Sequence, residues 1–397
     1  MKNIFIKTGF SQRKNEAEAV KEVLNKIWQE NIRLIIFFAD AGYNQFKINQ
    51  EIKKGIPHEV PFIGCSSARI EIPFMKMCKM ITSKGPKEGI VAMSIYSPKI
   101  KATVKIMKNI KDDWKKSSSQ ALNEASKDFN LNLQNINPQK YFGLFLCDAA
   151  SGVEDYILEN IYTVSNLLCV GGGSYGKFNI WRGLTNKIDP GRVHIKEGVF
   201  SDAGALALVE CEIPFKIDLT TSFYPTFIKF KITKAKGREI YEFNNQPAAK
   251  VYAKALGVSK VSLGVANLPN SRLLMKHPLG LMVKKRAFIR SVMGRNGNSI
   301  TVGSNVKEGQ ILYLMKRGDI VEKTKELMEE LKKELNQING MIVFQCGYRS
   351  LEADILGKTN KLFRAINAAP VIGLNAYGEY YGWLSMNQTL TLLAFGE

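Results

Sequence analysis

Charged and polar side chains follow two apolar stretches near the end of the chain. Cys346 and Arg349 lie in the second half of the stretch 341–350, after its apolar start, and Tyr377 and Glu379 follow the next apolar run. An arginine guanidinium binds a carboxylate through two parallel hydrogen bonds, while a glutamate accepts hydrogen bonds from an ammonium group. Together these side chains would suit a zwitterion such as an amino acid. The alternative is that Glu379 is simply paired with Arg349.

Two cysteines end apolar stretches, Cys147 and Cys346, and we place Ala39 at the corresponding position of a third stretch. A cysteine nucleophile needs a base held beside it, and no local arrangement supplies a histidine. An enzyme that uses Cys346 is therefore a minor alternative to ligand binding. Asp148 follows Cys147 and is predicted to cap the next helix, with ligand binding as its second possible role.

Gly172 and Gly173 belong to the segment Gly-Gly-Gly-Ser-Tyr-Gly-Lys, residues 171–177. A phosphate-binding loop requires a serine or threonine after the lysine and then a helix, and Phe178 follows here. The segment is therefore more typical of a strand bend in which small residues permit close packing. Both glycines are kept as candidate ligand-binding residues because they end an apolar strand.

The three histidines are His58, His194 and His277. None is paired at the spacing of a zinc site, so we expect no metal centre. A single histidine can be an axial ligand of haem iron, so haem is the alternative cofactor. If the protein binds no haem, we expect no cofactor, and the three histidine side chains should have ordinary hydrogen-bonding roles.

One supersecondary pattern occurs three times: a continuous apolar strand, a crossover helix, a second strand that reaches a glycine, and then a further apolar strand. Its spacing of roughly 25 residues suits a right-handed βαβ crossover. Apolar runs this continuous predict strands that are buried on both faces. The three copies begin with the strands 34–42, 141–152 and 341–350, reach the glycine-containing second strands 61–71, 167–176 and 370–382, and end with 89–97, 203–212 and 387–395.

The repeats predict an α/β fold of mixed, largely buried sheets flanked by helices and built from three β-α-β-β units. Two closely packed domains are expected, with residues 1–212 holding two copies and residues 213–397 holding hairpins and the third copy. The hairpins are predicted from segments such as 284–303, in which Asn-Gly favours a tight turn. Because ligands bind at the carboxyl ends of parallel strands, the residues considered above should gather there.

Composition limits the remaining possibilities. The 397 residues carry a net charge of +20, and no apolar run is long enough to span a membrane. The lysines are spread along the chain rather than gathered in a tail, so a nucleic-acid partner is not favoured. Six cysteines without a disulfide-like spacing fit a reducing cytoplasm.

At these residues the chain resembles the FIST family, whose domains are named for F-box and intracellular signal transduction proteins. The N-terminal half is similar through FFADAG, FIGCSS, LFLCD and CVGGGSYG. The C-terminal half is similar through His-Pro-Leu-Gly at 277–280, VFQCGYR at 343–349, PVIGLNAYGE at 370–379 and the Asn-Gln-Thr run that begins at Asn387. The family often has a histidine directly before this run, and this chain has Met386.

The resemblance implies a sensory protein that binds a small molecule and signals to a separate protein. The favoured ligand is an amino acid or small carboxylate, and the alternative is haem in a nitric oxide sensor. The expected partner is a histidine kinase, a cyclase or a chemotaxis-type protein. The candidate ligand-binding residues are Cys346, Arg349, Tyr377, Glu379, Asp148, Gly172, Gly173 and Asn387.

Overall fold

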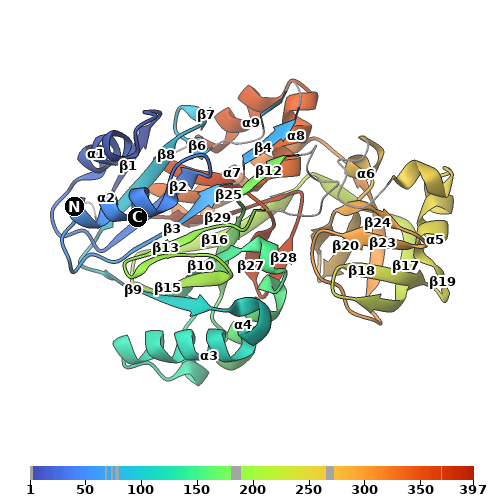
Figure 1. The fold of residues 1–397 in the computed structure, drawn as a ribbon, viewed down its shortest axis with the longest axis horizontal. Helices are drawn as coiled ribbons and strands as arrows, with labels where there is room; N and C mark the ends of the chain where they lie inside the picture. The colour runs from blue at the N-terminus through green and yellow to red at the C-terminus, as the bar shows by residue number, and fades with distance from the viewer. Residues whose placement is uncertain are drawn as a thin grey trace.

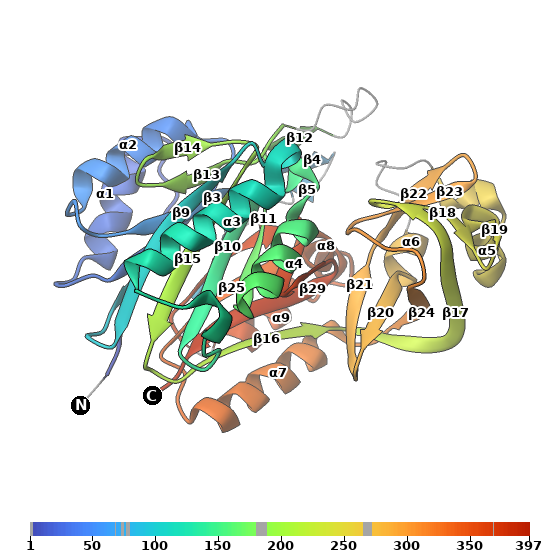
Figure 2. The ribbon, with the colours of Figure 1, turned by 90° about the horizontal axis from the view of Figure 1, so that it is seen from below.

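Three mixed six-stranded sheets make up the larger part of the molecule (Figures 1 and 2). The computed structural model describes residues 3–67, 69–72, 75–76, 80–179, 189–264, 272–367 and 369–397. The first repeat comprises β1 (Phe5–Ser11), α1 (Glu16–Ile27), β2 (Leu34–Asp40), α2 (Gln45–Gly55), β3 (Phe62–Ser67), β4 (Arg69–Ile72), β5 (Met75–Lys76), β6 (Met80–Thr82), β7 (Gly85–Lys87) and β8 (Ile90–Tyr96).

The second and third repeats contain equivalent elements. The second comprises β9 (Ile100–Lys108), α3 (Ile110–Asp128), β10 (Tyr141–Asp148), α4 (Glu154–Ser165), β11 (Cys169–Ser174), β12 (Lys177–Asn179), β13 (Val193–Ile195), β14 (Gly198–Phe200) and β15 (Ala203–Cys211). The third comprises β16 (Phe215–Thr221), α7 (Ile320–Leu335), β25 (Gly340–Cys346), α8 (Gly347–Ile355), α9 (Thr359–Ile366), β26 (Val371–Ala376), β27 (Glu379–Gly382), β28 (Leu384–Met386) and β29 (Thr389–Phe395).

The three sheets share one strand order, and each borrows its last hairpin from another repeat. The orders are β1-β8-β2-β3-β13-β14, β9-β15-β10-β11-β27-β28 and β16-β29-β25-β26-β6-β7. The hairpin of repeat one thus completes sheet three, that of repeat two completes sheet one, and that of repeat three completes sheet two. This cyclic exchange joins strands that lie far apart in the sequence, so no repeat forms its complete sheet alone.

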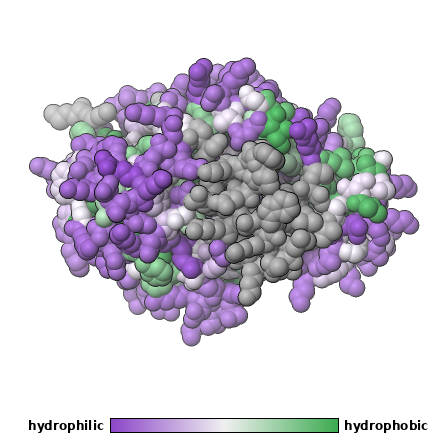
Figure 3. All heavy atoms as spheres, turned by 45° about the horizontal axis from the view of Figure 1, so that its top comes forward, coloured by the Kyte–Doolittle hydropathy of each residue, from purple (hydrophilic) through white to green (hydrophobic). Residues whose placement is uncertain are grey.

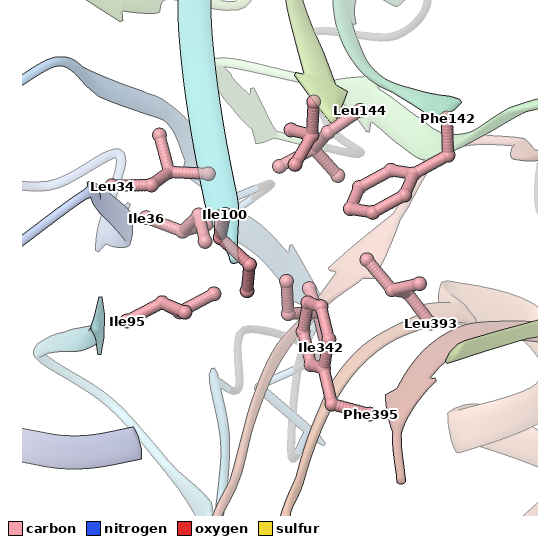
Figure 4. Close-up of a pocket in the computed structure, with 10 residues that line it drawn as sticks. Leu34, Ile36, Ile95, Ile100, Phe142, Leu144, Ile342, Leu393 and Phe395 are labelled. Atoms are coloured by element: carbon pink, nitrogen blue, oxygen red, sulfur yellow. The ribbon is translucent and has the colours of Figure 1, made fainter. Parts of the chain in front are cut away.

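The inner faces of the three sheets meet in one apolar core. Figure 4 shows Ile36, Leu144 and Ile342, one from the central strand of each sheet, pointing toward one another with no room for a water molecule between them. The outer faces are covered by α1 with α2, by α3 with α4, and by α7 with α9 (Figures 1 and 2). Every residue of β2, β10 and β25 is buried, which confirms the predicted strands with two buried faces.

A separate lobe is inserted between β16 and α7 and lies at one end of the molecule (Figure 2). Its core gathers apolar side chains from the hairpins and α5 around Phe230, Phe243 and Tyr252. The lobe comprises β17 (Phe223–Lys236), β18 (Glu239–Phe243), β19 (Gln246–Pro247), α5 (Ala248–Ala255), α6 (Arg272–Lys276), β20 (Leu279–Val283), β21 (Arg286–Arg290), β22 (Val292–Asn296), β23 (Ser299–Val302) and β24 (Ile311–Arg317).

The predicted α/β class and the threefold repeat are confirmed, and the Asn-Gly turn joins β22 to β23 with Gly297 at φ +58°. One alignment of the repeats was wrong by a residue. In the parallel strand pairs, Asp40 lies opposite Ser67, Asp148 opposite Ser174 and Cys346 opposite Ala376. Cys346 therefore corresponds to Asp40 and Asp148, and Gln345 is the counterpart of Cys147.

A shift of one residue changes the interpretation, because successive side chains in a strand point to opposite faces of the sheet. The misalignment arose from matching the two cysteines by type, although the glycines opposite Phe37, Phe145 and Val343 give the true register.

Candidate functional site

Cys346 ends β25 and is the N-cap residue of α8. Its side chain makes no capping hydrogen bond to the helix, and the backbone N–H groups of Gln388, Tyr348 and Arg349 lower its pKa by less than burial raises it. In the other repeats the equivalent residues are aspartates, and Asp40 and Asp148 accept N–H groups of the turns that follow them. Repeat three has thus replaced a capping carboxylate with a neutral, smaller group at the same strand end.

Glu379 begins β27 and is fully buried. It lies opposite Gly172, whereas the equivalent hairpin positions of the other repeats hold Val193 opposite Cys65 and Met80 opposite Leu374. Val193 and Met80 both pack in the shared apolar core. A carboxyl group therefore occupies a position that the other two repeats fill with an apolar side chain.

The Glu379 carboxyl group is only partly satisfied. Its Oε2 accepts hydrogen bonds from the Thr389 backbone N–H at 3.3 Å and from the Thr389 hydroxyl at 2.7 Å. Its Oε1 is buried and has no hydrogen-bond partner in the described part of the chain. Burial raises the pKa of Glu379 well above its ordinary range and also raises the pKa of the adjacent Cys346 thiol. A protonated, buried thiol does not favour use of Cys346 as a nucleophile.

The sequence suggested that Arg349 lies at the end of the strand 341–350. In the structure it lies in the first turn of α8, and its side chain is buried. Its Nη2 donates to the Thr324 hydroxyl at 2.5 Å and to the Ile320 carbonyl at 3.3 Å. Its Nε and Nη1 have no partner among the residues whose positions are described. Burial lowers the pKa of Arg349 to about 10, an effect that the charges of Glu352 and Glu379 oppose.

An unpaired buried charge is unfavourable by several kcal/mol, because it loses hydration and gains no partner. Arg349 and Glu379 interact electrostatically, yet no ion pair joins them in the described part of the structure. The alternative expectation of a direct pair between them is therefore wrong. Both side chains instead leave hydrogen-bonding atoms open inside the protein.

Tyr377 connects this site to the second repeat and to the lobe. Its ring stacks on Tyr175 with centroids 4.3 Å apart, and the Arg238 guanidinium lies 5.9 Å from the Tyr377 centroid. Arg238 comes from the turn between β17 and β18 in the lobe, and it forms an ion pair with Glu154 at the start of α4. The two tyrosines and Arg238 therefore link three parts of the fold.

The two glycines bring β11 against this aromatic pair. The Gly173 N–H donates to the Gly378 carbonyl, and the Tyr377 N–H donates to the Gly173 carbonyl. A Cβ atom on Gly173 would lie 2.2 Å from the Tyr377 carbonyl oxygen, and one on Gly172 would lie 2.8 Å from the Ala376 Cβ. Their structural role is close packing beside the site, and direct ligand contact stays a prediction.

Two of the sequence candidates are engaged elsewhere. Asp148 accepts backbone N–H groups from Ala150, Gly191 and Asp202, so its carboxylate holds three loops together. The Asn387 side chain accepts hydrogen bonds from the Ser291 N–H and the Ser304 hydroxyl, at the junction with the lobe. Neither residue contributes an unpartnered atom to the Arg349–Glu379 site.

The three histidines occupy different elements. His58 is exposed in the loop before β3, His194 is buried on β13 and bonded to Gln45, and His277 follows α6 in the lobe. Burial lowers the pKa of His194 to about 3 and also lowers that of His277. No cluster of three potential metal ligands occurs in the described ranges. Haem ligation by any of these histidines stays a prediction.

Sequence reasoning did not identify Thr389, Glu154 or Arg238. The sequence contained a signal for Thr389, because this residue belongs to the Asn-Gln-Thr run on which the family resemblance partly rests. Glu154 and Arg238 are 84 residues apart and meet only because the lobe packs against α4. Among the described residues, Glu154 Oε2, Arg238 Nε and the neighbouring Tyr380 hydroxyl are buried without a hydrogen-bond partner.

Comparison with known families adds to this geometry. The FIST N domain model matches residues 33–246, and the FIST C domain model matches residues 248–382. The chain belongs to the FIST family. FIST domains are recognised as sensory domains, which agrees with the expected class of function.

A relative and a solved structure show how far this FIST protein resembles others. It is 26% identical over 213 residues to the uncharacterized protein MJ1623 of Methanocaldococcus jannaschii, covering 49% of this chain and 41% of that relative. The chain thus matches about two-fifths of that protein's length. Cyanuric acid hydrolase from A. caulinodans aligns over 99% of both chains with a TM-score of 0.34 and 8% identity. Among the described residues, no helix has the length and apolar character needed to cross a membrane.

Proposed function

We propose that this FIST protein is a cytoplasmic sensor that binds a small zwitterion between Arg349 and Glu379. The observation that carries the proposal is the set of open hydrogen-bonding atoms on two buried, oppositely chargeable groups: Arg349 Nε and Nη1, and Glu379 Oε1. A ligand carboxylate would take the guanidinium donors, and a ligand ammonium would donate to the glutamate. Free amino acids carry both groups.

Repeat three supports a ligand role for this site. Glu379 occupies a position that is apolar in the two other repeats, and Cys346 replaces an aspartate. Unlike an aspartate at this strand end, the Cys346 thiol adds no second carboxylate that would compete with Glu379 for the ammonium group. Small carboxylates without an ammonium group would use Arg349 alone and bind more weakly.

The signal would pass through Tyr377. Glu379 lies two residues beyond this ring, and the ring contacts both Tyr175 and the lobe residue Arg238. Ligand contact with Glu379 would bias the packing of the lobe against α4, and a separate histidine kinase, cyclase or chemotaxis-type protein would read the altered surface.

Thermal unfolding with a panel of free amino acids, small carboxylates and haem tests the binding step. A ligand at about 100 times its Kd adds roughly 2.7 kcal/mol, enough to raise the Tm by several degrees. Arg349→Ala and Glu379→Gln should each abolish the shift produced by an amino acid. Arg364→Ala, which removes an exposed guanidinium, should leave it unchanged.

An Arg349→Ala protein that keeps its full affinity for the amino acid contradicts the proposed site. A response to haem alone, with a Soret band that disappears in a His58, His194 or His277 variant, would assign the haem alternative instead.

A further inference from the structure

A three-residue bulge pushes two apolar side chains out of the lobe. Along β17, Pro225 lies opposite Met315 and Lys229 lies opposite Tyr313, so residues 226–228 face a single residue of β24. Within this bulge Phe227 has a relative exposure of 101% and Ile228 of 40%. A fully exposed phenylalanine at a protruding point gains nothing for the folded state, because its ring stays in water.

Lysines alternate with apolar residues beside the bulge. Across the two strands, Lys229 pairs with Tyr313 and Lys231 pairs with Ile311. Both lysines are exposed, Ile311 is 47% exposed, and the Lys229 ammonium lies 5.5 Å from the Tyr313 centroid. Neither β17 nor β24 contains an acidic residue. We call Phe227, Ile228, Lys229, Lys231, Ile311 and Tyr313 the Phe227 surface.

Figure 3 shows a largely hydrophilic face with small separate hydrophobic patches, some of them at the lobe end of the molecule. The Phe227 surface combines both characters at one place, so its partner must offer negative charge together with an apolar interior. A second copy of the chain does not fit, because a twofold contact would set lysines against lysines. A protruding tip also lacks the flat or hollowed shape that a rigid protein surface would need.

We propose that the Phe227 surface docks peripherally on an anionic lipid bilayer. Phe227 and Ile228 enter the boundary between headgroups and acyl chains, and Lys229 and Lys231 remain among the lipid phosphates, with their aliphatic stems along the apolar layer. The contact is interfacial and does not require a spanning helix. It is independent of ligand binding at Arg349, which lies in the body of the molecule.

Co-sedimentation with vesicles tests the proposal directly. The full chain should bind vesicles of phosphatidylcholine with phosphatidylglycerol and should bind pure phosphatidylcholine at least tenfold more weakly. Phe227→Ser combined with Ile228→Ser should weaken binding to the anionic vesicles at least tenfold at unchanged net charge. Lys229→Glu combined with Lys231→Glu should weaken it at least as much.

Two matched controls separate this surface from general attraction by the net charge of +20. Lys115→Glu with Lys116→Glu makes the same charge change on the exposed side of α3, and Val261→Ser removes another exposed apolar side chain of the lobe, which is 72% exposed. Both controls should bind like the parent protein. Circular dichroism establishes that each variant is folded.

Three results would overturn the proposal. Failure of the parent protein to bind anionic vesicles would assign the surface to a protein partner. An equal loss of binding in the α3 control and in the Lys229 and Lys231 variant would show diffuse charge attraction. Unchanged binding of the Phe227 and Ile228 variant would show that the bulge does not enter the bilayer.

Discussion

The rings of Tyr175 and Tyr377 stack with their centroids 4.3 Å apart, joining the end of β11 to the end of β26. Along the chain, Tyr377 precedes the buried Glu379 by two residues. In space, the Tyr377 ring faces Arg238 of the lobe. The same ring therefore contacts the elements that would have to move together if a ligand at Glu379 altered the lobe.

Arg349 offers a test that separates function from stability. In an Arg349→Met protein the unpartnered Nε and Nη1 atoms disappear, and the two acceptors of Nη2 remain satisfied because the Thr324 hydroxyl donates to the Ile320 carbonyl. We expect the free energy of unfolding without ligand to be unchanged or to rise by about 1–3 kcal/mol. Chemical denaturation measures it.

The same Arg349→Met protein should show no amino-acid-dependent shift in Tm. A loss of about 3–5 kcal/mol would instead mean that the guanidinium stabilises the fold through contacts it makes in the native state.

The pH dependence of stability should carry a contribution from Glu379. Its pKa is raised in the folded protein, so between the ordinary value of 4.5 and the folded value the native state binds more protons than the unfolded state. Stability must then fall as the pH rises through this window. Glu379→Gln, which keeps the side chain neutral, should flatten the decline.

Urea unfolding of parent and variant at a series of pH values above 4.5 measures the difference between the two curves. The comparison isolates Glu379 from Glu154 and Glu352, whose pKa values burial also raises. Parallel curves would show that Glu379 is ionised in the folded protein as readily as in the unfolded chain.

Gly173 should be intolerant of any side chain. Its Cβ would meet the Tyr377 carbonyl oxygen at 2.2 Å, so Gly173→Ala must separate β11 from the Tyr377–Gly378 corner and break the hydrogen bonds that join them. We expect a loss of about 2–3 kcal/mol, with a disturbed tyrosine signal in the near-ultraviolet circular dichroism spectrum.

Gly357→Ala is the comparison, because a Cβ there meets nothing within 4 Å while φ is +65°. This variant should lose about 1 kcal/mol from backbone strain alone. Equal losses in the two variants would show that β11 can move away from Tyr377 at little cost.

The ion pair of Arg238 and Glu154 should stabilise the contact between lobe and core. Burial lowers the pKa of Arg238, but Glu154, Tyr377, Asp155 and Tyr175 together raise it by more, so the pKa is raised overall. Arg238→Met leaves Glu154 buried without its partner and should destabilise the protein by about 3 kcal/mol. Arg238→Met combined with Glu154→Gln should be less destabilised than the sum of the single variants.

A double-mutant cycle by chemical denaturation gives the coupling energy of this pair. Additive losses would mean that the two side chains do not interact in solution. In that case this ion pair would not hold the lobe against α4, and the proposed signal could not act through it.

Much of the architecture could be predicted from apolar patterning. The continuous apolar runs that became β2, β10 and β25 gave strands buried on both faces, since a strand between two layers has no solvent side to mark with polar residues. Helices such as α7 could be predicted from their apolar stripe. The turn between β22 and β23 could be predicted because Asn-Gly favours the positive φ of a tight turn. The resemblance to FIST domains rested on the same segments.

The candidate site could be predicted from the sequence only in part. The sequence by itself determined that Cys346, Arg349 and Glu379 lie close to where apolar strands stop, because local patterning sets where a strand stops. It did not determine that Glu379 replaces an apolar core residue, that Arg349 and Glu379 stay unpaired, or that Arg238 reaches Tyr377. Those relationships depend on the exchange of hairpins between sheets and on the docking of the lobe, and both join segments whose contacts no local preference encodes.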